Sequence, residues 1–361
     1  MNGLVDILYL LRDKDLSFQK KIEQKVKIWA GERNVRARMS GKVELTREQK
    51  KEVDRLWGRY KKISYYSHAF YLEKTGTFNP YYVPNYINRA IIDPFFNDWS
   101  MARYLDNKCY YPRMFPGVRM PEIVAMKVNG FWCDAESNLF GEQEAKNRIM
   151  NAGCCFIKAA TEAFGGKGVF YFDPQDMGIT GLENLLTKLR SDIVIQKEIK
   201  QSQIISKLND SSLNTLRLTS LLRKDGTVKI YGAMLRMGSA GAKVDNGGSG
   251  GIMAQVGDDG RLAKIAYNEE GVTFEKHPTS QVRFEDIIIP NYQEARDIIY
   301  KLHPMVPHFR LVAWDIGFTQ DDRPFLLEAN LNGGGINGMQ LTNGPLFKED
   351  TEEILDEVFG K

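Results

Sequence analysis

A short acidic hairpin near the C-terminus constrains the fold more than any other part of this sequence. Residues 313–335 are AWDIGFTQDDRPFLLEANLNGGG, in which two apolar runs flank TQDD and the second run ends at three glycines. If Asp321 and Asp322 form a two-residue hairpin loop, paired positions sum to 643 and Asp315 lies directly opposite Glu328. A looser loop at the two aspartates would shift this register.

The acidic face of this hairpin is suited to a metal ion. Because side chains alternate along a strand, Asn330 shares the face of Asp315 and Glu328. The other face carries the apolar side chains of Trp314, Ile316, Leu327 and Ala329. Two facing carboxylates repel each other unless a cation lies between them, and such oxygen ligands favour Mg²⁺ or Mn²⁺, with phosphate oxygens and waters as further ligands. The alternative is an edge hairpin whose acids face water.

A lysine and a glycine-rich loop form the second motif. Lys158 lies in the apolar run CFIKAA, and FGGKG follows at residues 164–168. The Walker A pattern is absent, and VFYF, a strand, follows where a phosphate-capping helix would start. A glycine loop between strands can fold over a nucleotide, so that its N–H groups reach phosphate oxygens near Lys158. The loop residues are Gly165, Gly166, Lys167 and Gly168. An ordinary hairpin turn is the alternative.

Polar residues also end or interrupt three other apolar strands. DIVIQKEI ends with Gln196, Lys197 and Glu198, where a hinge could hydrogen-bond an adenine edge; an ordinary strand end is the alternative. Arg217 and Arg236 lie within apolar strands, where an arginine is seldom buried without an anion. The glycine-rich segment 238–251 places flexible backbone close to such a ligand. Pairing of the arginines with a structural acid is the alternative.

The remaining pattern predicts an α+β protein. Residues 1–62 have a helical apolar period, whereas residues 63–100 are rich in Tyr, Phe, Pro and Asn, and their prolines exclude one continuous helix. We expect a packed, turn-rich aromatic segment there. From about residue 105, short strands alternate with helices, and turns at Asn129-Gly130 and Asp225-Gly226 predict hairpins.

Charge is concentrated near the N-terminus. Residues 11–62 hold 17 Lys or Arg against 8 Asp or Glu, whereas the whole chain has a net charge of only +3. Such an arm suits an anionic partner, either a membrane surface or a glycan assembly; a solvated helix pair is the alternative. No nucleic-acid-binding motif accompanies the charge, so we expect no nucleic-acid partner. The four cysteines and the lack of a long apolar run predict a soluble cytoplasmic protein, peripheral to the inner membrane face where the arm binds it.

Taken in order, the strand lysine, the glycine loop, the hinge, the strand arginines and the acidic hairpin resemble the ATP-grasp superfamily. QSQIISKLNDSSLNTLRLTSL, GAKVDNGGSGGI and WDIGFTQDDRPFLLEANLNGGG are similar to its sugar-transfer-associated family, which is related to α-L-glutamate ligases. The resemblance implies two α+β lobes that grip ATP and Mg²⁺ or Mn²⁺. It divides the chain into a helical region at 1–100, a smaller lobe at 101–200 and a C-terminal lobe at 201–361.

The resemblance also implies a role for each candidate residue. Lys108 and Lys158 would hold the ATP phosphates, Gly165 to Gly168 would cover them, and Gln196, Lys197, Glu198 and Ile199 would seat adenine. Asp315, Glu328 and Asn330 would hold the metal ions. Arg217 and Arg236 would neutralise the transferring phosphoryl group or an acyl phosphate. Two features depart from the family pattern: residues 1–100 are not α/β, and Gln196-Lys197 replaces a common acidic pair.

The implied activity is ATP-dependent carboxylate–amine ligation through an acyl phosphate with release of ADP. The subfamily resemblance points to an amino acid or small amine joined to a sugar-derived carboxylate during synthesis of a surface polysaccharide such as a capsule. One alternative is an ATP-grasp kinase that phosphorylates a hydroxyl. Another is a non-catalytic nucleotide-binding module of a glycan assembly complex.

Overall fold

The computed structural model describes residues 16–39, 41, 43–161, 168–189, 192–239, 251–332 and 334–361. The chain forms two compact units, one from residues 1–95 and 335–361 and the other from residues 96–334. The predicted boundaries at residues 100 and 200 stay predictions. No helix among the described residues is long and apolar enough to cross a membrane.

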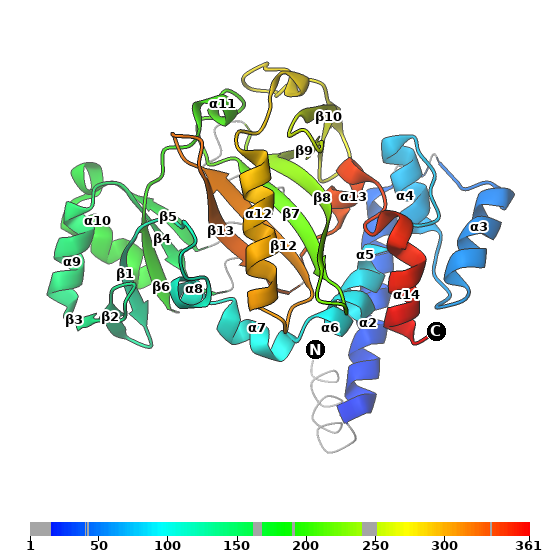
Figure 1. The fold of residues 1–361 in the computed structure, drawn as a ribbon, viewed down its shortest axis with the longest axis horizontal. Helices are drawn as coiled ribbons and strands as arrows, with labels where there is room; N and C mark the ends of the chain where they lie inside the picture. Colours follow the sequence, from blue (N-terminus) through cyan, green and yellow to red (C-terminus); the bar gives the residue numbers. More distant parts are fainter. Residues whose placement is uncertain are drawn as a thin grey trace. The chain divides into compact units, whose positions relative to one another are not determined.

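The larger unit contains two antiparallel sheets, which confirms the α+β class (Figure 1). One has the strand order β3-β2-β1-β6-β4-β5 and the other the order β11-β10-β9-β8-β7-β12-β13. The strands of the first are β1 (Ile123–Val128), β2 (Phe131–Cys133), β3 (Leu139–Phe140), β4 (Cys155–Ala159), β5 (Val169–Phe172) and β6 (Ile193–Lys197). Those of the second are β7 (Thr215–Leu222), β8 (Val228–Met237), β9 (Ile252–Val256), β10 (Leu262–Asn268), β11 (Thr273–Phe274), β12 (Leu311–Phe318) and β13 (Pro324–Asn330).

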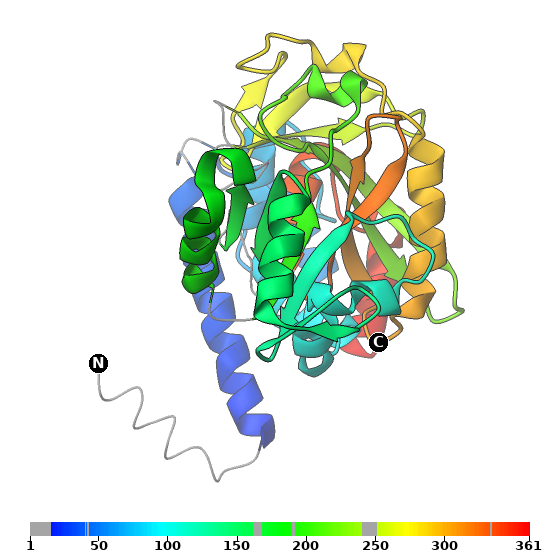
Figure 2. The ribbon, with the colours of Figure 1, turned by 90° about the vertical axis from the view of Figure 1, so that its left-hand side faces the viewer.

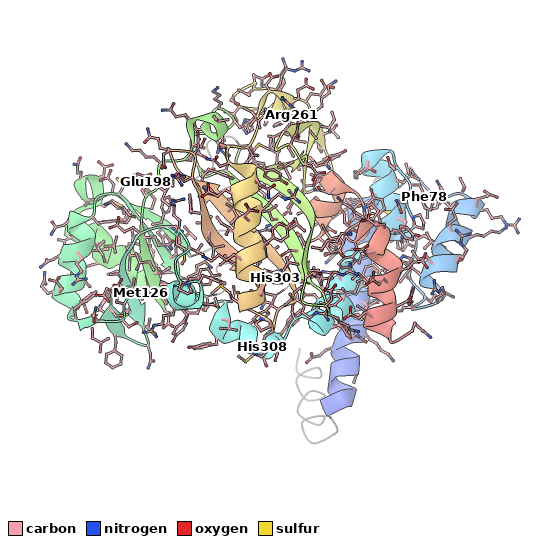
Figure 3. The ribbon with its side chains drawn as sticks, in the orientation of Figure 1. Phe78, Met126, Glu198, Arg261, His303 and His308 are labelled. Atoms are coloured by element: carbon pink, nitrogen blue, oxygen red, sulfur yellow. The ribbon has the colours of Figure 1, made fainter. Side chains whose placement is uncertain are left out.

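The two faces of the six-stranded sheet differ. One face packs its Ile157 and Ile195 side chains against α9 (Glu142–Asn151) and α10 (Pro174–Lys188), which lie in front of the sheet in Figure 2. Because side chains alternate, the neighbouring residues point to the opposite face. Met126, labelled in Figure 3, and Val194 form a small apolar cluster there.

The hairpin signals in the sequence are confirmed. Asn129 (φ 48°) and Gly130 (φ 89°) form the turn between β1 and β2, in which Val128 lies opposite Phe131. Positive φ angles at both central residues are those of a type I′ turn, which Asn-Gly favours. Gly226 (φ 84°) lies in the turn that joins β7 to β8.

The seven-stranded sheet holds the main core of the larger unit. Its apolar face packs against α12 (Tyr292–Leu302), and Trp314 and Phe318 are fully buried there. The remaining helices of this unit are short: α7 (Trp99–Leu105), η2 (Lys108–Tyr110), α8 (Tyr111–Met114), α11 (Gln203–Ser206), η5 (Phe284–Asp286) and η6 (His303–Met305).

The smaller unit is helical, as expected for the described part of residues 1–62. Its helices are α2 (Leu16–Arg38), α3 (Arg47–Trp57), α4 (Tyr66–Thr75), α5 (Asn85–Ile87), η1 (Asn88–Ile92), α13 (Asn337–Asn343), η7 (Lys348–Asp350) and α14 (Thr351–Phe359), and α6 (Asp93–Phe96) follows η1. Its core contains Trp57, Tyr71 and Phe347.

Residues 63–100 are more helical than their composition indicates. Helical structure runs without a break from Asn85 to Phe96 and includes Pro94. A proline removes the hydrogen bond to the carbonyl four residues earlier and crowds that carbonyl. The chain forms a wider π turn at this point, and the Ala90 carbonyl accepts a hydrogen bond from Gln24 Nε2 of α2 at 3.1 Å. Pro94 therefore widens the helix without ending it.

Candidate active site

The acidic hairpin pairs as predicted, but through a different loop. Asp315 lies opposite Glu328. The loop is not the two-residue turn that the sequence suggested, because Thr319 N donates to Arg323 O at 2.9 Å and Asp322 N donates to Thr319 O at 2.8 Å. Three residues therefore lie in the loop, and the last of them, Asp322, has the left-handed φ of 62° typical of this turn.

A bulge restores the predicted pairing. The register shifts by one residue between Asp315 and Ile316, so that Ile316 lies opposite Leu326. Leu327 is then the extra residue of the bulge, and Leu326 packs in the core beside Ile316. The expectation that Leu327 shares the core face is therefore wrong.

Asp315 is buried, and two arginines hold it. Its neighbour on β7 is Arg217, which donates from Nε at 2.7 Å and from Nη2 at 2.6 Å to the two carboxylate oxygens. Arg236 Nη1 lies 3.2 Å from Oδ2. Burial alone would raise the pKa of Asp315, but Arg217 and Arg236 together lower it below its ordinary value. Both arginines thus pair with the acid that was predicted to bind a metal.

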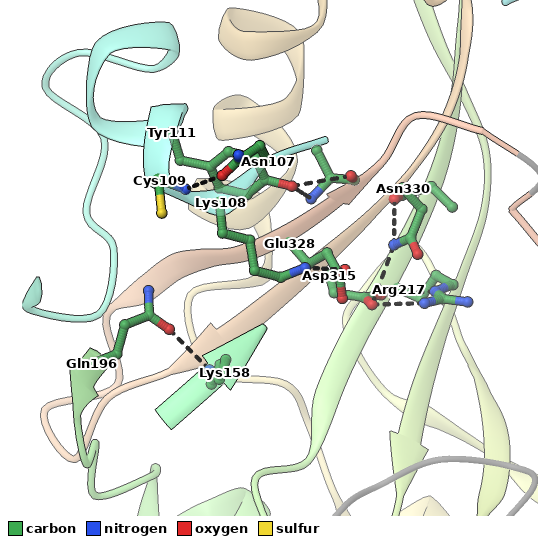
Figure 4. Close-up of polar contacts among 12 residues, drawn as sticks. Asn107, Lys108, Cys109, Tyr111, Lys158, Gln196, Arg217, Asp315, Glu328 and Asn330 are labelled. Carbon is green, nitrogen blue, oxygen red and sulfur yellow. Dashed lines mark hydrogen bonds and ion pairs between the residues drawn. The ribbon is translucent and has the colours of Figure 1, made fainter. Parts of the chain in front are cut away.

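Glu328 and Asn330 lie beside Asp315 on the adjacent strand (Figure 4). Lys108 Nζ donates to Glu328 Oε1 at 2.8 Å. Asn330 Nδ2 donates to the Ala313 carbonyl at 3.0 Å and approaches Asp315 Oδ2 at 3.4 Å. This orientation leaves Asn330 Oδ1 and Glu328 Oε2 with no hydrogen bond from any described side chain or backbone group.

Lys158 points from the six-stranded sheet and contacts the predicted hinge. Its Nζ donates to Gln196 Oε1 at 2.9 Å. Both residues lie on the sheet face that carries Met126 and Val194. Burial lowers the pKa of Lys158 to about 8; the positive charge of Lys108 adds to the effect and Glu328 opposes it. A nearby polyanion would raise this pKa, so Lys158 would be more fully protonated when a polyanion is bound.

The backbone of the hinge is partly occupied. Lys197 N donates to the Glu122 carbonyl and Glu198 N donates to the Cys154 carbonyl, each at 2.9 Å. Ile199 N–H, just beyond the Glu198 labelled in Figure 3, has no hydrogen-bond partner among the described residues. The amide oxygen of Gln196 is engaged by Lys158, so a backbone group such as Ile199 N–H is the better candidate for adenine.

Most of the glycine loop lies outside the described residues. This holds for Gly165, Gly166 and Lys167. Gly168 has a φ of 77°, and its carbonyl accepts a hydrogen bond from Ala159 N at 2.9 Å. A Cβ at this position would lie 3.3 Å from Ala159 Cβ. Conformation and space therefore both favour glycine where the loop rejoins β5.

Asn107 and Asp192, which the sequence did not predict as site residues, both anchor Lys108. Asn107 Nδ2 donates to Asp192 Oδ2 at 2.9 Å, and Asn107 Oδ1 accepts from Cys109 N at 3.0 Å. Lys108 N donates to the Ala160 carbonyl at 3.0 Å. The sequence does contain a local signal for the turn, because an Asn such as Asn107 often caps a short turn two residues before the backbone N–H that it accepts from. The contact with Asp192 is long-range and has no local signal.

Tyr111 was also missed, and it holds the outer edge of β13. Its hydroxyl lies 3.2 Å from both Ala329 N and Ala329 O. Ala329 separates Glu328 from Asn330, so this hydroxyl fixes the backbone between two candidate metal ligands. Burial also raises the pKa of nearby Asp106 to about 7. The positive charge of Lys108 opposes this rise, and the negative charge of Glu328 adds to it.

The assembled site carries excess positive charge. Lys108, Arg217 and Arg236 contact the carboxylates of Asp315 and Glu328, and Lys158 lies close enough for the charges of Lys108 and Glu328 to affect its pKa. With all six ionised the excess is two charges, and an ionised Asp106 would still leave a net positive charge. An arrangement of this kind favours a ligand with several negative charges, such as a polyphosphate.

The oxygen donors fit a hard divalent cation when a polyanion binds with it. Asp315, Glu328 and Asn330 supply carboxylate and amide oxygens, which Mg²⁺ prefers. No cluster of three His, Cys, Asp or Glu exists among the described residues, and Asn330 supplies an amide oxygen beside the two carboxylates. Because Asp315 already binds Arg217 and Arg236, the two arginines would repel a cation that arrived alone. Phosphate oxygens that arrived with the cation would give the arginines another anionic partner.

The sequence is similar to a described family of proteins. A family model described as sugar-transfer associated ATP-grasp matches residues 88–355. No curated protein matches the sequence. Among solved structures, the ATP-grasp ligase PsnB complexed with a minimal precursor is 13% identical, covers 73% of this chain and 63% of its own, and has a TM-score of 0.41.

Two further structures show a similar level of likeness. D-alanyl-alanine synthetase A from Vibrio cholerae is 13% identical over 77% of this chain and 67% of its own, with a TM-score of 0.40. The biotin carboxylase domain of 2-oxoglutarate carboxylase from Hydrogenobacter thermophilus, in complex with MgADP, is 12% identical over 69% and 47%, with a TM-score of 0.41. The chain spans about half to two thirds of the length of these proteins.

Proposed function

The chain belongs to the sugar-transfer-associated ATP-grasp family, and from this premise we propose that it is an ATP-dependent carboxylate–amine ligase that releases ADP. The observation that carries the proposal is the cluster of four cations around Asp315, Glu328 and Asn330. Phosphoryl transfer asks a protein mainly for positioning and for stabilisation of negative charge, and this cluster supplies both.

In the proposed complex, adenine lies beside the hinge, next to the side chains of Lys158 and Gln196. Ile199 N–H is oriented by the hydrogen bonds of Lys197 N and Glu198 N and donates to the base. Lys158 exchanges its contact with Gln196 for a phosphate oxygen. The phosphate chain then runs towards Lys108. Lys108 contacts Glu328, the first of the candidate metal ligands.

Divalent metal ions, if bound here, would supply positive charge that offsets the negative charge developing on the phosphates. Asp315, Glu328 and Asn330 would hold them. Arg217 and Arg236 would then turn part of their hydrogen bonds from Asp315 to the transferring phosphoryl group. The same two arginines thereby stabilise the acid before binding and the phosphoryl charge during transfer.

The proposed reaction has two steps. A substrate carboxylate oxygen attacks the γ-phosphorus, the bond from that phosphorus to the bridging oxygen breaks, and ADP leaves. The amine nitrogen then attacks the acyl carbon, inorganic phosphate leaves with the electron pair of the C–O bond, and the amine loses a proton to form the amide. A sugar-derived carboxylate, an amino acid or small amine, and a role in surface-polysaccharide synthesis are proposed from the family description alone.

The test incubates the full chain with Mg-ATP and paired panels of uronic acids and amino acids. We expect ADP and a product with the mass of an amide, and hydroxylamine should trap the acyl phosphate as a hydroxamate. ADP with a stable phosphorylated hydroxyl would make the protein a kinase, and AMP would exclude both reactions. Glu328→Gln is the control for turnover that depends on the site. Nucleotide binding without any turnover would instead favour a non-catalytic nucleotide-binding module, and absence of nucleotide binding would overturn the proposal.

A further inference from the structure

Helix α2 in the smaller unit has one face fixed against its neighbours. Gln24 Nε2 donates to the Ala90 carbonyl of η1 at 3.1 Å. Gly31 packs so closely on α5 that a Cβ there would lie 2.2 Å from Tyr86 Cβ. These contacts, seven residues apart, hold two turns of α2 and determine which of its side chains face outward. The first turns of α2 extend beyond the other helices of this unit (Figures 1 and 2).

The outward face of α2 has an exposed apolar stripe. Val26 is 57% exposed and Trp29 is 59% exposed. Ala30 and Ala37, also exposed, follow at helical spacing and lie on the same line. Val26 and Trp29 are more than half exposed among the described residues, so the stripe is open to a partner.

Cations border this stripe on both sides. Lys25 and Arg36 lie along one side, and Lys27 and Arg38 lie along the other, and all four are exposed. Arg33 lies in the stripe with its guanidinium carbon 4.8 Å from the centre of the Trp29 ring. Glu23 is the one exposed acid between residues 22 and 38. The outward face is therefore apolar along its centre and strongly basic at its margins.

We propose that this face of α2 lies on an anionic membrane surface, with the helix parallel to the bilayer. Tryptophan prefers the boundary between headgroups and acyl chains, where its ring is apolar and its N–H can be solvated. Flanking lysines and arginines reach anionic headgroups while their methylene stems cover apolar surface. A nucleic acid would use the cations but would leave the Val26 and alanine stripe without an apolar partner. The inference does not depend on the proposed ATP chemistry.

The experiment measures binding of the full chain to vesicles of phosphatidylcholine, alone or mixed with phosphatidylglycerol. We expect sedimentation only with the mixed vesicles and weaker binding as salt is raised. Changing Lys25, Lys27 and Arg36 together to glutamine should weaken binding on the order of a hundredfold. Trp29→Ala should weaken it about tenfold. Brominated acyl chains should quench tryptophan fluorescence, and Trp29→Phe should remove that quenching.

Matched controls separate this face from general charge and exposure. Phe131, 63% exposed in the larger unit, provides the aromatic control Phe131→Ala. Three exposed lysines of that unit provide the charge control, Lys207→Gln, Lys224→Gln and Lys301→Gln. All variants should keep the wild-type thermal unfolding midpoint. Absence of binding to mixed vesicles, equal effects of the control variants, or retention on RNA without vesicle binding would each overturn the proposal.

Discussion

Asp315 and Glu328 face each other across one hairpin, yet they respond differently to mutation. Asp315 is 2% exposed and binds Arg217 and Arg236, so Asp315→Asn removes a buried carboxylate from contact with two half-buried arginines. Loss of such a partner costs about 3–5 kcal/mol, which would reduce folded protein as well as turnover. The Glu328 side chain is 30% exposed, and its cationic partner among the described residues is Lys108.

Glu328→Gln is therefore the better test of the metal site. We expect it to keep the fold, with a free energy of unfolding within about 1 kcal/mol of wild type, and to lower ADP formation at least about a hundredfold because one anionic ligand is lost. Initial rates across a Mg²⁺ titration and a thermal melt provide the measurement. Near-normal rates at every Mg²⁺ concentration would contradict the assignment.

Lys158 makes nucleotide binding dependent on pH. Its pKa is lowered to about 8 in the free protein, and a polyphosphate raises that pKa because it favours the charged amine. Above pH 8, binding must take up a proton, so affinity should fall about tenfold per pH unit until the pKa of the complex is reached. Stability changes in the opposite sense: the folded pKa lies below the unfolded value of 10.5, so stability rises between the two.

Gln196→Glu tests this effect. A carboxylate at the position of the amide oxygen, 2.9 Å from Nζ, should raise the pKa of Lys158 and move the loss of affinity to higher pH. Calorimetric titration with ADP from pH 7 to 10, in buffers of different ionisation enthalpy, measures affinity and proton uptake together. Identical pH profiles for the two proteins would show that another group controls binding.

The hairpin β12–β13 shows how far local sequence can predict an element. Asp315 lies opposite Glu328 as expected, but because two errors of one residue cancel: the loop holds three residues and a bulge adds one to β13. The longer loop is favoured by Thr319, whose Oγ1 accepts from Arg323 N at 3.1 Å. Strand type, face and turn position followed from alternation and turn residues, whereas the bulge depends on packing around it.

The residues on either side of Lys108 could not be found in this way. Asn107 and Tyr111 act through contacts with Asp192 and Ala329, which lie 85 and 218 residues away. Local propensity carries no information about such contacts. The sequence therefore predicted Lys108 and the site residues on the strands, and it omitted Asn107, Tyr111 and Asp192, which position them.

Tyr111→Phe tests the positioning of the metal ligands. Loss of the hydroxyl frees both backbone groups of Ala329, which should cost about 1–2 kcal/mol of stability and loosen Glu328 and Asn330. We expect the apparent KM for Mg²⁺ to rise about tenfold with a smaller change in kcat, and Mn²⁺ binding in the presence of ADP to weaken in paramagnetic resonance titrations. Tyr110→Phe is the matched control, and equal effects of both changes would contradict a specific role.

At the scale of the whole molecule, both ends of the chain build the smaller unit. Gln340, fully buried on α13, accepts from Val83 N at 2.9 Å and donates to the Val83 carbonyl at 2.9 Å and the Tyr71 hydroxyl at 2.8 Å. A glutamine in NGMQLTN has no sequence signal for these partners. The strands of the larger unit follow one another in the chain, so their sheets were more predictable than this association of distant helices.

This organisation predicts unequal effects of truncation. Every described member of three apolar clusters in the larger unit lies between residues 96 and 334, so among the described residues these cores contain no side chain from residues 1–95 or 335–361. We expect residues 96–334 expressed alone to fold and to bind ADP, because each core is complete. A chain ending at residue 334 should keep the larger unit but lose the smaller one, since Val83 and Tyr71 lose Gln340.

Limited proteolysis and hydrogen exchange measure both outcomes. In the chain of residues 1–334, cleavage should be confined to residues before 96, and amides of β7 and β12 should exchange as slowly as in the full chain. Protection of α3 and α4 in that chain would contradict the predicted dependence on α13, because their buried groups would then be satisfied without Gln340. Rapid exchange throughout residues 96–334 would instead show that the larger unit needs the chain ends, although its apolar clusters do not include them.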